Sequence, residues 1–420
     1  MVLVGAAKAD ISPQQPVYLG GYGFGPVRLS TGVLQPLYAR ALAIRAPDNR
    51  PEHTLIFAAL DSQGYFAAYQ SGPYGIADMR ATISQRLQIP VANIVIASTH
   101  SHAAPDTVGF WGGVPAEYLR RVYNQTIAAI THAVTHLAPA RLRSGTASID
   151  GYVRSFGSDQ PGQQPWLTDT QIRALQALSV QDGHSLATLL NVSVHPTALG
   201  ASNTKAAPDW PGATATQLEQ RFGGTAIIMI GALGHAWPGA PASLPQPNNR
   251  LEGMQRYGTY IAQQAISALQ QARPIASPTL CAANRTFREV VTSAPLLTGL
   301  QFLGRSGHER ILRSLTAPYF VPPDVLGIEV SAFRIGDEVF FAAPVEAYPS
   351  LFQKLRTQIP AFAAYFFGLA NDQLGYATSL GEYAGALSNS PTDEALFIVA
   401  PTFGEDLVQQ LSDAAHQIGF

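Results

Sequence analysis

Residues 93–105 read Asn93-Ile94-Val95-Ile96-Ala97-Ser98-Thr99-His100-Ser101-His102-Ala103-Ala104-Pro105. An apolar run of strand length leads directly into two histidines, and in extended geometry their rings project from the same face. Proteins of the α/β class place ligands beyond the carboxyl ends of their strands. Neutral imidazole is the commonest protein ligand of zinc. The stretch therefore predicts either a metal site or two hydrogen-bonded loop histidines, and the spacing alone leaves both interpretations open.

Three more predicted strands end in a side chain that can bind a metal. Residues 186–194 lead into His195, which Pro196 holds in an extended conformation. Residues 338–342 precede Glu346, and residues 364–370 precede a polar loop with Tyr376. Taken singly, Glu346 could be a carboxylate favoured by the dipole at the start of a helix. Tyr376 could be an ordinary residue of the hydrophobic core. Two histidines and a carboxylate are a common catalytic zinc set, so the strand ends together favour a metal site.

The hydrophobic pattern predicts an α/β fold. Apolar runs of strand length recur at residues 54–60, 93–97, 186–194, 225–230, 338–342 and 364–370. Helical periodicity lies between some of them, at residues 117–137, 253–272, 349–359 and 405–418. We expect a layered domain of mixed β-sheets flanked by helices, with the metal site at the carboxyl ends of strands. We expect one domain over residues 1–420, with residues 274–326 as an irregular excursion.

Composition excludes several classes of protein. The chain has 420 residues, 46% of them hydrophobic, which is enough for a large core. The net charge is −2 and no basic patch stands out, so we expect no nucleic-acid partner. The apolar runs are too short to span a membrane, which predicts a soluble protein without a membrane span. The first residues do not form a signal peptide. This predicts a cytoplasmic location, and a secreted one stays open if a leader was removed.

Several catalytic motifs are absent from the sequence. It contains no P-loop, no Gly-x-Ser-x-Gly nucleophile elbow and no His-Glu-x-x-His. His132 and His136 are four apart on a predicted helix, a spacing that can bind zinc. A solvated pair on the polar helix face is the favoured interpretation. The strand-end residues thus remain the strongest candidates for chemistry.

Short motifs in a fixed order connect these residues to a known family. They are Ala9-Asp10-Ile11-Ser12-Pro13, Gly20-Gly21-Tyr22-Gly23, Thr99–Pro105, Val194-His195-Pro196-Thr197, Asp209-Trp210-Pro211-Gly212 and Gly375-Tyr376-Ala377-Thr378-Ser379-Leu380-Gly381-Glu382-Tyr383. At these residues the sequence resembles the N-terminal catalytic domain of the neutral (non-lysosomal) ceramidases. The motifs span nearly the whole chain, and their shared order makes the resemblance specific.

The resemblance implies a site and an activity. Carried over to this sequence, one zinc ion is held by four residues, His100, His195, Glu346 and Tyr376. Three further residues match catalytic positions: His102 handles substrate or protons, Arg154 contacts the substrate on its carbonyl side, and Tyr383 is a second active-site tyrosine. The implied reaction is zinc-dependent hydrolysis of an N-acyl amide bond through a metal-activated water.

The sequence departs from the family at the expected substrate pocket. Where the family has Asn-x-Gly-Asp-x-Ser-Pro, this chain places His235 at the aspartate and Trp237 at the serine. Asp106 stands in a changed Gly-Pro-Gly-Gly stretch. We expect these three residues to line the pocket of a small-molecule or lipid-like substrate other than ceramide. The family's C-terminal immunoglobulin-like domain is expected to be missing.

Two other functions remain open from the sequence. The same site suits an esterase, a lactonase or a cyclic-amide hydrolase. A catalytically dead binding protein is the alternative outside enzymes, because a fold can persist after its site is lost.

Overall fold

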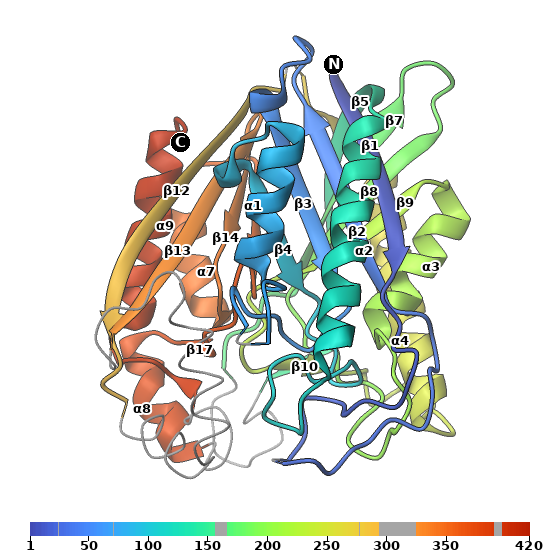
Figure 1. The fold of residues 1–420 in the computed structure, drawn as a ribbon, viewed down its shortest axis with the longest axis vertical. Coiled ribbons are helices and arrows are strands. Elements are labelled where there is room, and N and C mark those ends of the chain that lie inside the picture. The colour runs from blue at the N-terminus through green and yellow to red at the C-terminus, as the bar shows by residue number, and fades with distance from the viewer. Residues whose placement is uncertain (24, 70, 156–165, 277, 294–324, 390–396) are drawn as a thin grey trace.

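A computed structural model describes residues 1–420 except 24, 70, 156–165, 277, 294–324 and 390–396 (Figure 1). Its described part contains a nine-stranded mixed sheet. In spatial order the strands are β4 (Ile94–Ser98), β3 (Thr54–Leu60), β2 (Tyr38–Arg45), β1 (Val2–Asp10), β5 (Ala138–Ser148), β7 (Gln171–Ser179), β8 (Ser185–Val192) and β9 (Thr225–Ile230), and β11 (Arg273–Pro274) also pairs with β5. The pairs β3–β4 and β8–β9 are parallel, and the other pairs are antiparallel.

A second sheet packs face to face against the first. Its strands run in the order β12 (Leu280–Val290), β13 (Val325–Ile335), β14 (Glu338–Ala342) and β16 (Ala363–Phe367). One hydrophobic cluster contains buried residues from both sheets, among them Phe57 of β3 and Phe340 of β14. Strands buried on both faces need apolar residues at nearly every position. This explains why β3, β4, β14 and β16 have nearly continuous apolar sequences with every residue buried.

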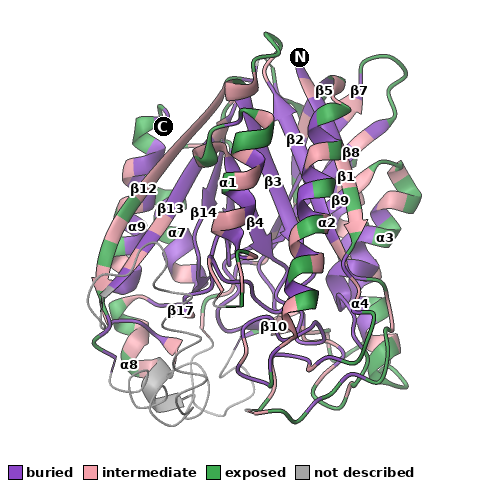
Figure 2. Ribbon diagram, viewed as in Figure 1, coloured by how far each residue is buried: buried purple, intermediate pink, exposed green. Residues whose placement is uncertain are grey.

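Helices cover the outer face of each sheet. The helices α1 (Ile76–Leu87), α2 (Ala116–Thr135), α3 (Trp210–Phe222) and α4 (Arg250–Gln270) pack on the large sheet. The helices α7 (Pro349–Gln358) and α9 (Phe403–Gln417) pack on the small one. Figure 2 shows buried strands between helices whose outer sides are exposed. The fold is thus four layers, helix–sheet–sheet–helix, and the predicted mixed-sheet α/β class is confirmed.

Part of the predicted irregular excursion is a regular strand. Within residues 274–326, β12 pairs with β13 in antiparallel register from Leu280 to Val290. It lies at the edge of the small sheet, and most of its side chains are only half-buried. Edge strands tolerate polar residues, so Asn284, Arg285 and Arg288 obscure the strand pattern. That part of the prediction is corrected, while residues 277 and 294–324 lie outside the described residues.

The carboxyl ends of β4, β8, β14 and β16 lie at one edge of the layered core. Parallel pairing brings β14 and β16 to the same edge. The backbone of the loop after β16 also bonds to β4, with the Asn371 N–H donating to Ile96 O at 2.8 Å. No helix in the described residues is long and apolar enough to cross a membrane. The topology thus places the predicted strand-end residues at this same edge of the core.

Replacing Phe57 by alanine is expected to destabilise this core strongly. Phe57 is fully buried, and its ring centroid lies 5.4 Å from Phe333, 5.5 Å from Phe340 and 5.3 Å from Phe367. Such truncations lower the free energy of unfolding by about 3–5 kcal/mol. Urea denaturation measures the loss. The control Phe362→Ala removes a ring that is 56% exposed, so we expect less than about 1 kcal/mol. Equal losses in the two variants would contradict the assigned core.

Candidate metal centre

His100 follows β4 in a left-handed turn, with φ of 62°, and is almost fully buried. Its Nδ1 lies 2.6 Å from the main-chain oxygen of Gln63. Because a carbonyl oxygen can only accept, this contact places the ring proton on Nδ1. The Nε2 atom of His100 is then left as an acceptor. A backbone carbonyl on the second ring nitrogen is the usual support of a metal-binding histidine.

His195 is fixed in the same way after β8. Its Nδ1 lies 3.0 Å from the main-chain oxygen of Ala236, which again leaves Nε2 as an acceptor. Its main-chain oxygen accepts from Trp210 Nε1 at 3.0 Å. The ring of Trp237 stacks on the His195 ring, with centroids 4.2 Å apart and planes 24° apart. The imidazole is therefore held on its edge and on one face.

Glu346 brings a carboxylate oxygen between these two histidines. Its Oε2 lies 3.2 Å from His100 Nε2 and 3.2 Å from His195 Nε2. Burial raises the pKa of Glu346, but His100 and His195 outweigh that effect and hold this pKa well below its usual range. The carboxylate is therefore ionised. Its other oxygen, Oε1, accepts from Gln373 Nε2 at 3.2 Å.

The three convergent atoms suit a cation. Both imidazole Nε2 atoms and the carboxylate oxygen can present lone pairs to one positive charge, which would hold them together. Tetrahedral zinc with bonds of about 2.05 Å separates its ligand atoms by about 3.3 Å. The observed 3.2 Å separations match that value. Nitrogen and carboxylate donors also suit zinc chemically, so His100, His195 and Glu346 fit such an ion.

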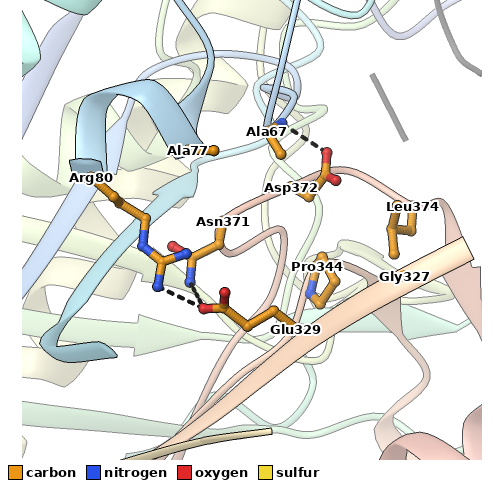
Figure 3. Close-up of a pocket in the computed structure, with 9 residues that line it drawn as sticks. All are labelled: Ala67, Ala77, Arg80, Gly327, Glu329, Pro344, Asn371, Asp372 and Leu374. Atoms are coloured by element: carbon orange, nitrogen blue, oxygen red, sulfur yellow. Dashed lines mark hydrogen bonds and ion pairs between the residues drawn. The ribbon is translucent and has the colours of Figure 1, made fainter. Parts of the chain in front are cut away.

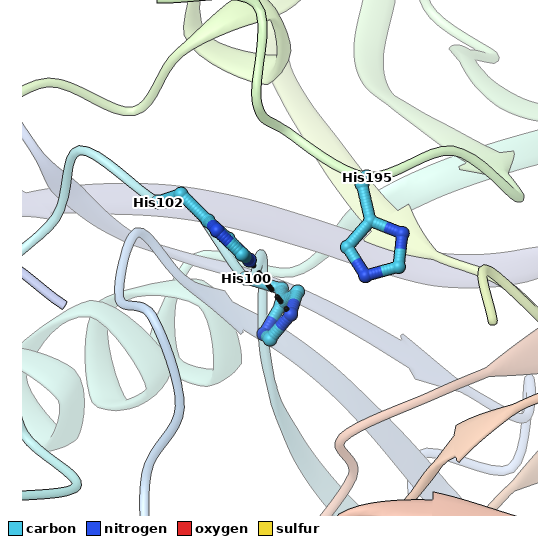
Figure 4. A group of neighbouring side chains, drawn as sticks. All are labelled: His100, His102 and His195. Atoms are coloured by element: carbon cyan, nitrogen blue, oxygen red, sulfur yellow. Dashed lines mark hydrogen bonds between the residues drawn. The ribbon is translucent and has the colours of Figure 1, made fainter. Parts of the chain in front are cut away.

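His102, two residues after His100, joins the same cluster (Figure 4). Its Nε2 lies 3.2 Å from His100 Nε2, and ligand atoms of His100, His102 and His195 all lie within 4.8 Å of one another. Burial, together with His100 and His195, lowers the pKa of His102 well below its usual range, so its ring is neutral. Its Nδ1 is buried without a hydrogen-bond partner among the described residues. The geometry thus offers His102 as a further nitrogen at the centre.

The two predicted tyrosines lie on the Glu346 side of the site. Tyr376 belongs to β17 (Tyr376–Ala377), which pairs in parallel with β15 (Glu346–Ala347), and Tyr376 is the register partner of Glu346. It is buried and its ring contacts Tyr348. Tyr383 lies on α8 (Leu380–Asn389), is half-buried and packs against the same aromatic cluster. The backbone therefore places Tyr376 beside Glu346, and its role as fourth ligand stays a prediction.

Arg154 and Trp237 face each other across a small ribbon. The strands β6 (Val153–Ser155) and β10 (Ala236–Pro238) pair antiparallel, with Arg154 opposite Trp237. Arg154 is exposed, and Trp237 is half-buried against His195. Trp237 therefore forms an aromatic wall on the outer side of the His195 ring. Arg154 stands next to that wall on the solvent side.

The two other predicted pocket residues are held by their surroundings. His235 is buried, bonds through Nε2 to the Tyr348 hydroxyl and meets the Trp166 ring edge-on at 4.1 Å. Asp106 is fully buried and accepts from the main-chain N–H groups of Gly109, Trp111 and Gly113 at 2.7–2.8 Å. Its carboxylate therefore fixes the conformation of the loop at residues 106–113. Asp106 also lines a cavity of about 320 Å³ under this loop.

Comparisons with known proteins give the family and the fold of the chain. A sequence model of the neutral/alkaline non-lysosomal ceramidase N-terminal domain matches residues 2–236. The chain belongs to this family. Its fold is similar to that of neutral ceramidase from Pseudomonas aeruginosa, with a TM-score of 0.77, 19% identity, and coverage of 99% of this chain and 74% of that one. A structure described as ceramidase complexed with C2 matches with a TM-score of 0.77, 18% identity, and coverage of 99% and 75%. No curated protein matches the chain.

Two residues of this ceramidase-family site were missed in the sequence. Gln63 and Gln373 line a cavity of about 70 Å³ that Glu346 also lines. Gln63 follows the end of β3, and Gln373 lies in the loop after β16. Neither belongs to a motif, and only the packing of distant loops brings them together. The one available signal was their place just after apolar strands.

A polar anchor behind the site holds the loop that carries Gln373 (Figure 3). Glu329 pairs with Arg80 at 2.6 Å and accepts from Asn371 Nδ2 at 3.4 Å. Asp372 accepts from the Ala67 N–H at 2.9 Å, and burial raises the pKa of Asp372 to about 7. The space enclosed there is only about 10 Å³, too small for a ligand. We therefore assign this anchor a positioning role.

Proposed function

We propose that this chain is a zinc-dependent amidohydrolase that cleaves an N-acyl amide, a carbon–nitrogen bond other than a peptide bond. Family membership supports a hydrolase acting on an amide bond. The observation that carries the proposal is the convergence of His100 Nε2, His195 Nε2 and Glu346 Oε2 on one point. Such a centre, built at the end of a buried core, suits one zinc ion.

The side chains of the site divide the work of hydrolysis. When bound, a zinc ion activates water and polarises a carbonyl group. His100, His195 and Glu346 hold the ion, and we assign Tyr376 as a fourth, displaceable ligand. His102, kept neutral by burial, is proposed to take a proton from the attacking water at Nε2 and to pass it to the leaving nitrogen. Arg154 and Tyr383 are proposed to stabilise the developing oxyanion.

We further propose that the substrate is not ceramide. Trp237 covers one face of His195 where the family motif has a serine. A tryptophan adds a large, flat and mainly apolar surface beside the reacting centre. Together with His235 and Asp106, it is proposed to shape the pocket for a smaller or more polar amide. A flat wall also suits a ring, so a cyclic amide, a lactone or another ester is the second candidate.

A substrate panel tests the proposed reaction. Purified zinc-loaded protein is assayed with N-acyl amides, ceramide, simple esters and lactones. We expect turnover of N-acyl amides, with ceramide among the poorest of them. Protein that binds one zinc per chain but hydrolyses none of these compounds would refute the proposal. Folded protein that binds no zinc would favour the catalytically dead binding protein.

A further inference from the structure

The cavity of about 70 Å³ beside Glu346 is lined by side chains of two kinds. Its walls are mainly apolar, formed by Phe66, Val108, Phe110, Trp111, Leu374 and Phe397. Its polar lining is formed by Glu346, Gln63 and Gln373. An apolar pocket with a few convergent polar groups is the usual form of a small-molecule site. The cavity therefore has the chemistry of a binding subsite.

The two glutamines have unused acceptors. Gln63 is 4% exposed and Gln373 is 9% exposed, and the Oε1 atom of each is buried without a hydrogen-bond partner among the described residues. Gln373 Nε2 donates to Glu346 Oε1 at 3.2 Å, which fixes the orientation of that amide. A buried acceptor without a partner is costly and is usually satisfied by a ligand or water. Both glutamines are therefore poised to accept a hydrogen bond.

The size of the cavity limits the group that fits. A cavity of about 150 Å³ holds a benzene ring, so about 70 Å³ holds roughly three or four carbon atoms. The rings of Phe110 and Phe397 contact each other edge-on, with centroids 5.1 Å apart. Phe66 and Val108 line both this cavity and the one of about 320 Å³, so they stand between the two. A longer acyl chain extends beyond the space that these side chains line.

We propose that this cavity binds a short acyl group, of about three or four carbons, that carries a hydroxyl or N–H donor next to the scissile carbonyl. The proposal rests on the proposed amide hydrolysis. Gln373 contacts one oxygen of Glu346 while the other oxygen faces the histidines, so its free acceptor lies close to the reacting centre. Gln63 and Gln373 select the donor, and the apolar walls select the length. The cavity does not constrain the amine side of the substrate.

Paired substrates test this inference on the zinc-loaded protein. We expect 2-hydroxypropanoyl anilide to exceed propanoyl anilide in kcat/KM by roughly tenfold, the effect of one good hydrogen bond. Octanoyl anilide should be the poorest of the three. In Gln63→Leu the ratio between the first two should fall toward one. In Val108→Ala, which opens the cavity toward its neighbour, the octanoyl substrate should gain on the propanoyl one.

The outcomes separate this inference from the proposed function. Hydrolysis of the anilides without preference for the hydroxyl, or with preference for octanoyl, overturns the subsite and leaves the amidohydrolase standing. Failure to hydrolyse any anilide is evidence against the amidohydrolase. In that case calorimetry tests the subsite by measuring the Kd of 2-hydroxypropanamide and of propanamide. The subsite requires 2-hydroxypropanamide to bind roughly tenfold more tightly. If Gln63→Leu fails to fold, the two ratios in the wild-type protein still decide.

Discussion

Replacing Glu346 by glutamine is expected to abolish amide hydrolysis and to remove the bound zinc. The carboxylate supplies the negative charge toward which both histidine Nε2 atoms converge. An amide at this place has no charge and is a poor zinc ligand. Loss of an outer partner of a metal ligand already costs roughly 10–100-fold. We therefore expect kcat/KM to fall by more than about 100-fold, measured with the best substrate of the panel.

A matched variant separates this effect from loss of a buried ion pair. Glu219 is also a partly buried carboxylate that forms ion pairs, with Lys8 and Arg40. It also accepts from the Ala226 N–H at the start of β9. Glu219→Gln should lower stability slightly and leave the zinc content unchanged. Full activity in Glu346→Gln would show that the centre does not need this carboxylate. A similar loss in both variants would point to a general effect on folding.

Replacing His102 by alanine is expected to lower turnover by about 10²–10⁴-fold while zinc stays bound. That range is the usual contribution of a general acid or base. His102 is neutral, buried and next to the other two histidines, so it is placed to exchange protons. Single-turnover kinetics on zinc-loaded protein measure the change. The loss should appear in kcat more than in KM, because the proton moves in the chemical step.

An exposed histidine provides the control for this variant. His132 lies on the outer side of α2, with its ring stacked on that of His136. His132→Ala should keep full turnover and full zinc content. If His102→Ala instead loses its zinc, His102 is a ligand of the ion. The proposed division between His100 and His102 is then wrong.

The best sequence predictions concern strands that are buried on both faces. Residues 54–60, 225–230 and 338–342 were predicted with the same bounds as β3, β9 and β14, because nearly all of their side chains are apolar. Strands such as β5 alternate buried and exposed residues and were not predicted. The helix α3 was missed because it begins with Trp210-Pro211-Gly212. Its start depends on the Asp209 carboxylate, which accepts from the Trp210 N–H.

The sequence predicted those residues of the site that follow an apolar strand. His100, His195 and Glu346 could be proposed together because each follows a recognisable apolar run, and the structure brings them within hydrogen-bonding distance. The Asp106 carboxylate accepts from the backbone of its own loop, and its predicted place in the substrate pocket stays a prediction. The pair Gln63 and Gln373 carries no motif. Its position depends on contacts between segments about 300 residues apart, which a local pattern does not contain.

The zinc content of three purified proteins tests the central claim most directly. The wild-type chain, His195→Ala and His102→Ala are loaded with zinc, freed of excess metal and measured by elemental analysis, with folding checked by circular dichroism. The proposed centre predicts one zinc per chain in the wild type, none in His195→Ala and one in His102→Ala. A folded wild-type protein without zinc, or a His195→Ala variant that keeps its zinc, would contradict it.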